Sequence, residues 1–166
     1  MIEDRIKQQV YSKIFNFVAG IPRTNKEVRE RLQRYVSKIE LDEGEKETLI
    51  AETLEMLNQD CTIDDARYAH DYVVNSQLST KPRSLYKIKQ FLYKKGIPEK
   101  IIESELQQVS GSFDGANAQK DLEKLSRRFQ KLEGFVLRNK LTSHLIRKGY
   151  PSDVVYNVVD TYLGVK

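Results

Sequence analysis

Lysines and arginines recur along three segments of the sequence at spacings that place them on one face of a helix. The outward positions hold Arg31, Arg34 and Lys38 in the first segment, Lys87 and Lys94 in the second, and Lys140 and Arg147 in the third. Rows of cations suit a phosphate backbone or a helical filament. Two alternatives stay open: a solvated face, or cations that favour the negative end of a helix dipole.

The full set of candidate binding residues adds the cations that lie beside these positions. They are Arg83, Lys95, Arg127, Arg128 and Lys148.

The charge is also polarised along the chain, which carries a net +4 over 166 residues. Residues 40–60 contain eight acids and one base, whereas residues 120–148 contain nine bases and three acids. An acidic first third and a basic remainder indicate a surface with two different faces.

The other reactive side chains do not form a catalytic or metal-binding pattern. His70 and His144 lie on different predicted helices, without a second ligand at metal-binding spacing. Asp64 and Asp65 stand at a predicted helix start, where the helix dipole favours acids without any catalytic role. Cys61, the single cysteine, has no partner motif and fits a reducing compartment. We therefore expect a protein that is not an enzyme and uses no cofactor, metal or small-molecule substrate.

The chain carries neither a predicted leader nor a predicted membrane span. Its first 13 residues are rich in charge and lack an apolar core, which differs from a signal peptide. No apolar run approaches the 18 residues that a membrane helix requires. These patterns predict a cytoplasmic protein that does not contact membranes.

The elements that position the cations form a repeat. The phrase Lys94-Lys95-Gly96-Ile97-Pro98 returns as Arg147-Lys148-Gly149-Tyr150-Pro151, displaced by 53 positions. Apolar residues on both sides keep the same offset. A supersecondary unit that recurs at such a period buries its apolar face against its neighbours. The pattern predicts an all-α, elongated and curved array of three three-helix repeats.

Each repeat contains three predicted helices. In the second, helices are expected from about Asp64 to Gln77, from Pro82 to Lys95, and after Pro98. Gly96 and Gly149 fit left-handed residues that end the middle helices. In the third repeat, a helix is expected from about Asp114 to Glu133. No alternation of period two competes with this helical prediction.

Helix starts and buried stripes follow from local signals. We expect Pro82 in a first helical turn, Thr62 and Asp65 as a weak capping box, and Thr24 and Glu27 as a second. The predicted inward positions include Ala51 and Ala66.

The N-terminal segment is compatible with a divergent first repeat, although it lacks the glycine corner. A merely helical segment stays open as an alternative. The predicted domains are residues 1–60, 61–110 and 111–166.

Residues 63–73 combine two adjacent acids with regularly spaced aromatic residues. The stretch Ile63-Asp64-Asp65-Ala66-Arg67-Tyr68-Ala69, followed by Tyr72-Val73, is similar to the D-D-x-x-Y/F-A-x-x-Y/F-V pattern of the RecX family. The blocks around Gly96 and Gly149 also agree in order and spacing. The resemblance covers roughly residues 62–159 and is weakest in the first repeat. It implies structural roles for Asp65, Tyr68, Tyr72, Gly96 and Gly149.

The resemblance implies a regulatory protein of DNA recombination and repair. RecX proteins bind filaments of the RecA recombinase on single-stranded DNA and restrain their extension, ATP hydrolysis and strand exchange. The expected partners are thus the RecA filament and its single-stranded DNA, contacted by a monomer. The residues alone leave two alternatives open: a helix-turn-helix protein that reads duplex DNA, and a helical-repeat scaffold without a nucleic-acid partner.

Overall fold

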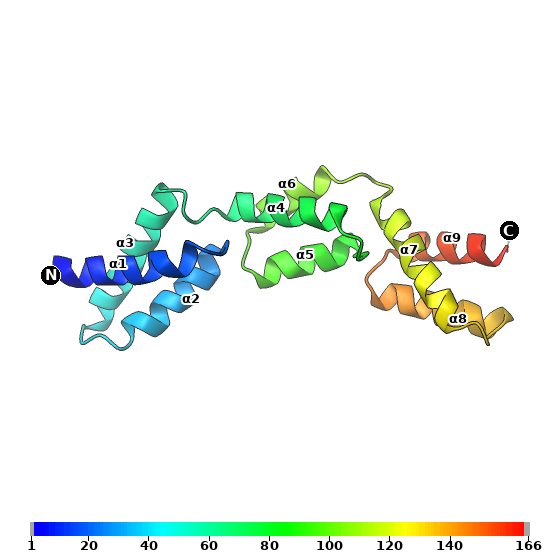
Figure 1. Cartoon of the computed structure of the whole chain (residues 1–166), viewed down its shortest axis with the longest axis horizontal. Coiled ribbons are helices and arrows are strands. Elements are labelled where there is room, and N and C mark those ends of the chain that lie inside the picture. The colour runs from blue at the N-terminus through cyan, green and yellow to red at the C-terminus, as the bar shows by residue number, and fades with distance from the viewer. Residues whose placement is uncertain (1, 165–166) are drawn as a thin grey trace. The chain divides into compact units, whose positions relative to one another are not determined.

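The protein is all-α over residues 2–164, the part of the chain that this computed structural model describes (Figure 1). Within that range no strand occurs, and the helices confirm the predicted fold class. The elements are α1 (Asp4–Val18), α2 (Asn25–Val36), α3 (Glu43–Gln59), α4 (Asp65–Leu78), α5 (Leu85–Lys94), α6 (Glu99–Gln107), α7 (Phe113–Arg128), α8 (Gly134–Arg147) and α9 (Ser152–Leu163).

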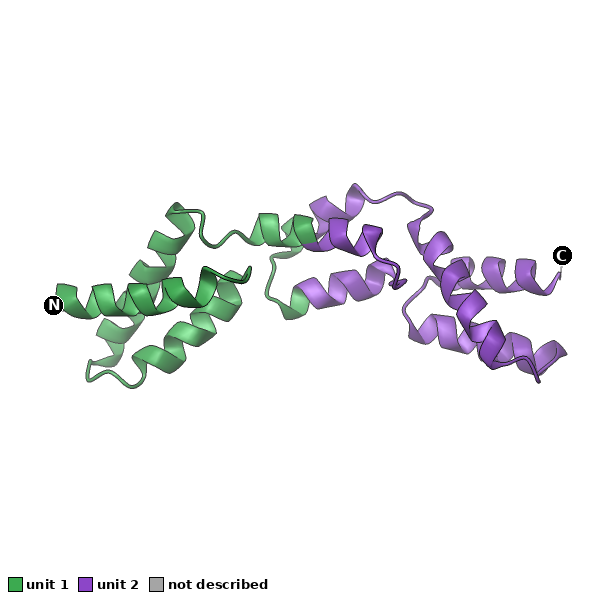
Figure 2. Cartoon of the chain, viewed as in Figure 1, with its two compact units in different colours: residues 1–71, 93–101 green, residues 72–92, 102–166 purple. Residues whose placement is uncertain are grey.

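The helices gather into two compact units (Figure 2). Unit 1 comprises residues 1–71 and 93–101, and unit 2 comprises residues 72–92 and 102–166. The helices α4 to α6 therefore contribute to both units. The division into domains at residues 60 and 110 stays a prediction.

In unit 1, α1, α2 and α3 pack around one apolar core. Its buried members are Ile2, Val10, Ile14, Val18, Val28, Leu32, Val36, Leu49, Ile50, Leu54, Leu57 and Ile63. The stripe predicted for α3 is wrong at Ala51, which is exposed, while Thr53 is buried. The buried face of α3 follows Leu49 and Leu57, and a residue two positions after Leu49 points to the opposite side.

In unit 2, α7, α8 and α9 enclose a second core. Its buried members are Ala118, Leu122, Leu125, Leu141, Leu145, Tyr150, Val155 and Val159. The helix expected to reach Glu133 ends at Arg128 instead. The chain turns there, because the Leu132 N–H bonds to the Phe129 carbonyl and Gly134 takes a left-handed φ of 54°. The reversal lets α8 pack back onto the same core.

Side chains at the helix starts explain where α2, α4 and α5 begin. The capping box of α2 is confirmed: the Thr24 hydroxyl accepts the Glu27 N–H at 3.3 Å, and the Glu27 carboxylate accepts the Thr24 N–H at 3.2 Å. The expected box at Thr62 is wrong, since Asp64 accepts the Arg67 N–H at 2.9 Å and starts α4. Ala66, expected inward on that helix, is exposed.

The start of α5 also differs from the prediction. Pro82 precedes the helix rather than lying in its first turn, because Ser84 is the capping residue. The Ser84 hydroxyl accepts the Lys87 N–H at 3.3 Å, which satisfies one of the unpaired donors of a helix start.

The start of α2 docks on the corner that contains Gly96, within unit 1. The Thr24 hydroxyl donates to the Lys95 carbonyl at 2.7 Å, and the Asn25 N–H donates to the Asp65 carboxylate at 2.9 Å. Gly96 has a φ of 80°, and a Cβ placed there would lie 2.6 Å from Cβ of Lys26. The left-handed conformation predicted for Gly96 is confirmed, and close packing adds a second reason for glycine.

The start of α5 makes the same contacts with the corner at Gly149, within unit 2. The Ser84 hydroxyl donates to the Lys148 carbonyl at 2.8 Å, and the Leu85 N–H donates to the Asp114 carboxylate at 2.8 Å. Gly149 has the predicted left-handed backbone, with a φ of 86°, and a Cβ there would lie 2.6 Å from the Tyr86 ring. The repeated sequence phrase thus encodes a docking surface as well as a turn.

Candidate nucleic-acid interface

Three candidate cations of the first segment line one groove at the end of α2, in unit 1. The α2 groove has a volume of about 370 Å³ and is lined by Arg31, Arg34, Tyr35, Ser37 and Lys38. The Arg34 side chain is held by a hydrogen bond from Nε to the Glu30 carbonyl, at 3.2 Å. The Arg31 guanidinium lies 5.3 Å from the centre of the Phe17 ring. No carboxylate lines the groove, so an anion is its natural occupant.

Three further candidates meet in a second groove, between the end of α7 and α8 in unit 2. The α8 groove has a volume of about 730 Å³ and is lined by Arg128, Phe129, Phe135, Val136, Asn139, Lys140, Ser143, His144, Ile146 and Arg147. Its charged side chains are all basic, and they sit beside apolar ones. The candidate Arg127 lies in the same last turn of α7 and is exposed.

The side chain of His144 lies in the α8 groove, beside Arg147. Burial lowers its pKa below the ordinary 6.5, and the nearby charges of Arg147, Lys148 and Arg128 lower it further, against an opposing effect of Asp121. The Arg147 guanidinium lies 3.1 Å from His144 Nδ1. His144 thus lies close to the cations that line the groove, and burial is the larger cause of its lowered pKa.

Sequence reasoning missed the apolar and histidine members of the α8 groove. Phe135 is 75% exposed and Val136 is 53% exposed, at the first turn of α8. The buried stripe of that helix uses Leu141 and Leu145. An apolar pair outside the stripe was the signal that could have found them, because a helix that only needs a core would carry polar residues there.

The remaining candidates on and near α5 occupy separate surroundings. The Arg83 side chain donates a hydrogen bond to the Tyr72 hydroxyl, within unit 2. Nζ of Lys87 lies 5.9 Å from the centre of the Tyr86 ring, and Lys87 is exposed. Lys94 is exposed, and its carbonyl accepts a hydrogen bond from Nζ of Lys26 within unit 1. The single basic stripe across all three repeats stays a prediction.

Two candidates are engaged in ion pairs inside the protein. Nζ of Lys95 lies 2.6 Å from the Glu27 carboxylate, and Nζ of Lys148 lies 2.5 Å from the Asp121 carboxylate. The hydrogen bond from Lys95 also helps to hold the pKa of Glu27 below its ordinary value, against the effect of burial, which would raise it. Both lysines therefore have structural partners, and we leave them out of the proposed contact surface.

The residues to which the resemblance assigns structural roles make contacts within the protein. Asp65 accepts the Asn25 N–H described above. Tyr72 stacks on Phe91 with ring centres 4.2 Å apart. The hydrogen bond to Glu27 raises the pKa of Lys95 above its ordinary value; burial opposes this rise, and the interaction with Tyr68 adds to it.

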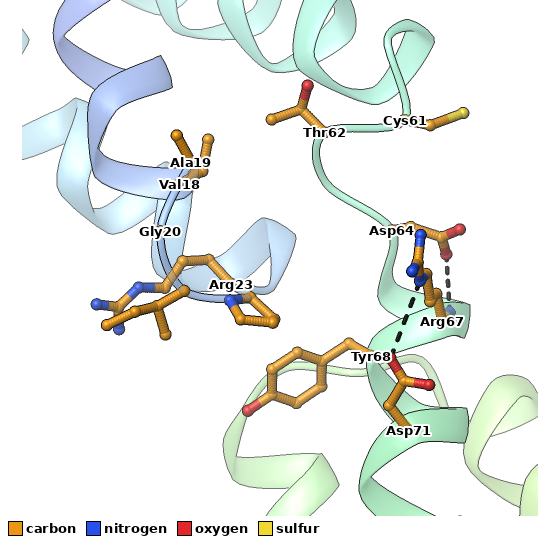
Figure 3. A pocket seen from close by; sticks show the side chains of 12 residues that line it. Val18, Ala19, Gly20, Arg23, Cys61, Thr62, Asp64, Arg67, Tyr68 and Asp71 are labelled. Atoms are coloured by element: carbon orange, nitrogen blue, oxygen red, sulfur yellow. Dashed lines mark hydrogen bonds and ion pairs between the residues drawn. The ribbon is translucent and has the colours of Figure 1, made fainter.

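Tyr68 also lines a small pocket in unit 1, between the α1–α2 connection and the start of α4 (Figure 3). Its volume is about 270 Å³. The charges on its α4 side compensate one another: the Arg67 N–H bonds to Asp64, and the Arg67 side chain lies 3.9 Å from Asp71. Opposite charges in balance make this pocket a poorer anion site than either groove.

Other kinds of site have no support in the described residues. Across residues 2–164, no three His, Cys, Asp or Glu side chains gather closely enough to hold a metal ion. In the same range, no helix has the length and apolar character needed to span a bilayer.

Comparisons with known proteins place the chain in a family. The model of the second three-helix domain of RecX matches residues 64–106, and that of the third matches residues 114–159. A regulatory protein RecX of Streptococcus agalactiae is 34% identical over 144 residues, which cover 86% of this chain and 51% of that protein. One from Prosthecochloris aestuarii is 25% identical, covering 98% of this chain and 99% of that protein.

A solved structure shows the same fold. The crystal structure of RecX from Lactobacillus salivarius matches with a TM-score of 0.78 and 25% identity, covering 96% of this chain and 97% of that one. This chain spans about half the length of several curated relatives that it matches. The two domain models together cover more than half of the chain, in the order that the sequence motifs predict. The chain therefore belongs to the RecX family.

Proposed function

We propose that this protein regulates RecA by binding the RecA filament on single-stranded DNA and limiting its extension, ATP hydrolysis and strand exchange. The protein acts as a monomer in the cytoplasm and performs no chemical step itself. Relatives named regulatory protein RecX support the regulatory role. The observation that carries the filament assignment is the pair of basic grooves, each lined by three candidate cations and no carboxylate.

Physical chemistry connects these grooves to a filament target. A nucleoprotein filament offers phosphates at regular intervals together with a protein surface. Clustered cations release counterions from phosphates on binding, which gives affinity without sequence selectivity. In such a target the α8 groove can contact phosphates, while the α2 groove can contact acidic side chains of the protein surface.

The test is the single-stranded-DNA-dependent ATPase of RecA, measured with increasing amounts of this protein. We expect the ATPase rate to fall. A variant with Lys87→Glu and Lys140→Glu should inhibit less, because both side chains are exposed at matching positions of their helices. The matched control is Lys13→Glu with Lys100→Glu, which reverses the same charge at two exposed positions that are not among the candidate cations.

Three results would contradict the proposal. If the wild-type protein leaves the RecA ATPase rate unchanged, the proposed regulatory role is wrong. Equal inhibition by the wild type and by the Lys87→Glu, Lys140→Glu variant would show that these cations serve only solvation. Selective binding of a duplex sequence would favour the helix-turn-helix alternative instead.

A further inference from the structure

The α8 groove contains exposed apolar side chains that a contact between its cations and phosphates would not require. Phe135 is three-quarters exposed, and Ile146, also in the groove, is 41% exposed. The core of unit 2 does not include these side chains, because the buried apolar residues that α8 contributes to it are Leu141 and Leu145. Exposed aromatic and aliphatic side chains gathered around a cavity mark a binding surface.

The charges of the groove restrict what can occupy it. Arg128, Lys140 and Arg147 line it, and it contains no acid. The Arg147 guanidinium lies 3.1 Å from Nδ1 of His144, which also lines the groove. The occupant therefore has to combine negative charge with a flat or apolar surface.

The length of α8 sets the scale of that occupant. At a rise of about 1.5 Å per residue, Lys140 lies about 7.5 Å and Arg147 about 18 Å along the helix from Phe135. With a spacing of about 3.4 Å per stacked nucleotide, this length corresponds to on the order of five nucleotides. The groove thus matches a short run of single strand.

We propose that the α8 groove binds single-stranded nucleic acid by stacking an unpaired base on Phe135, while Lys140 and Arg147 contact two phosphates of the same strand. This deepens the proposed function and rests on it, since it assigns one groove a ligand and a mode of binding. Bases of a duplex stack on one another and leave no free face, whereas every unpaired base can stack on an aromatic ring. An acidic protein segment is the competing occupant, and the experiment separates the two.

The experiment measures binding to the full-length protein without RecA. The probe is a fluorescein-labelled deoxythymidine oligonucleotide, followed by anisotropy. We expect Phe135→Leu to weaken binding by on the order of tenfold, because one base–aromatic stack is lost. Phe135→Trp should bind at least as tightly as the wild type. The matched control is Tyr162→Leu, which removes an exposed aromatic ring on α9 outside the groove.

A second readout reports stacking directly. The chain contains no tryptophan, so Phe135→Trp introduces a single fluorophore at the groove. The deoxythymidine oligonucleotide should quench its fluorescence. An abasic oligonucleotide of the same length and charge should quench it little and bind more weakly.

Several outcomes would overturn the proposal. If Phe135→Leu binds the oligonucleotide as tightly as the wild type does, no base stacks on Phe135. The same conclusion follows if the abasic strand binds as tightly as the deoxythymidine strand. If Phe135→Leu keeps oligonucleotide affinity but loses inhibition of RecA, the groove binds protein instead. Equal affinity for duplex DNA would also exclude stacking.

Failure of this inference is distinguishable from failure of the proposed function. Oligonucleotide binding without any effect on the RecA ATPase would overturn the proposed function and leave the stacking mode intact. Inhibition of the ATPase by wild type and Phe135→Leu alike, with unchanged oligonucleotide affinity, would overturn only the stacking mode.

Discussion

Gly149 combines two constraints in one residue. Its φ of 86° disfavours any residue with a Cβ, and a Cβ would also lie 2.6 Å from the Tyr86 ring. We expect Gly149→Ala to lower the free energy of unfolding by about 2 kcal/mol or more, as the sum of backbone strain and steric overlap. Urea denaturation measures this change.

The matched control for Gly149 is Gly134, in the same unit. Its φ is 54°, yet a Cβ there meets no atom within 4 Å. Gly134→Ala should therefore lower the free energy of unfolding only by the cost of the backbone strain, about 1 kcal/mol. Equal effects of the two substitutions would show that the close packing at Gly149 has no energetic weight.

Glu27 links the stability of the α2 docking contact to pH. Burial by itself raises the Glu27 pKa, but hydrogen bonds from Lys95 and from the Thr24 amide more than offset it, so the pKa is lowered below 4.5. A lowered carboxyl pKa gives stability that is present above the unfolded pKa and is lost as the pH falls through the folded pKa. Glu27→Gln should therefore be less stable than wild type at pH 7, and this difference should shrink below about pH 4.5.

Urea titrations at pH 7 and at pH 3.5 test this prediction. Gln keeps a side-chain oxygen for the Thr24 amide, so the variant isolates the charge. A difference that is constant with pH would contradict a role for the Lys95–Glu27 ion pair.

At the scale of elements, the hydroxyl caps of α2 and α5 each serve two helices. Ser84 accepts from Lys87 in its own helix and donates to the Lys148 carbonyl at the end of α8. We expect Ser84→Ala to cost about 1 to 2 kcal/mol, because both a cap and the partner of a distant carbonyl are lost. Thermal or urea melts followed by circular dichroism give this value.

Ser112 provides a matched control for the Ser84 prediction. It precedes α7 but makes no side-chain capping bond to that helix, and it is exposed. Ser112→Ala should change stability by at most a few tenths of a kcal/mol. If Ser84→Ala is as mild as Ser112→Ala, the docking of α5 does not depend on the hydroxyl.

At the scale of the whole molecule, the two grooves belong to different units and are expected to meet different parts of the target. The acidic residues 40–60 and the α2 groove lie in unit 1, whereas the α8 groove lies in unit 2. We predict that Arg31→Glu with Arg34→Glu reduces RecA inhibition but hardly changes binding to free single-stranded DNA. Lys140→Glu with Arg147→Glu should reduce both.

Salt dependence separates these contributions. Each phosphate contact adds about 0.7 to the slope of log affinity against log salt on a single strand. The Lys140→Glu, Arg147→Glu variant should lose about 1.4 of that slope, and the Arg31→Glu, Arg34→Glu variant should keep it. Full-length variants suit this test, since deleting residues 1–60 would remove the Thr24 and Asn25 contacts at the Gly96 corner. If the Arg31→Glu, Arg34→Glu variant loses the slope and the Lys140→Glu, Arg147→Glu variant keeps it, unit 1 rather than unit 2 contacts the single strand.

The sequence alone determined the features that depend on neighbouring residues. Helical periodicity, the glycine corners and the Thr24 cap are local, and all three appear in the structure. The motif around Asp65 and Tyr68 was also sufficient to indicate the family that the comparisons show. Catalytic and metal-binding motifs are also short and local, so the sequence could be searched for them directly. It contains no such pattern, which favoured a binding surface as the functional site.

Only the tertiary structure decided which polar groups are used inside the protein and which side chains remain at the surface. Lys95 meets Glu27 across 68 positions, and Lys148 meets Asp121 across 27, so helical spacing could not distinguish these lysines from their exposed neighbours. Ser84 rather than Pro82 sets the start of α5, because its hydroxyl has a partner at Lys148 that lies 64 positions away. The α8 groove likewise forms only where the turn after α7 brings Phe129 and Arg128 against α8, since a cavity requires walls from separate segments.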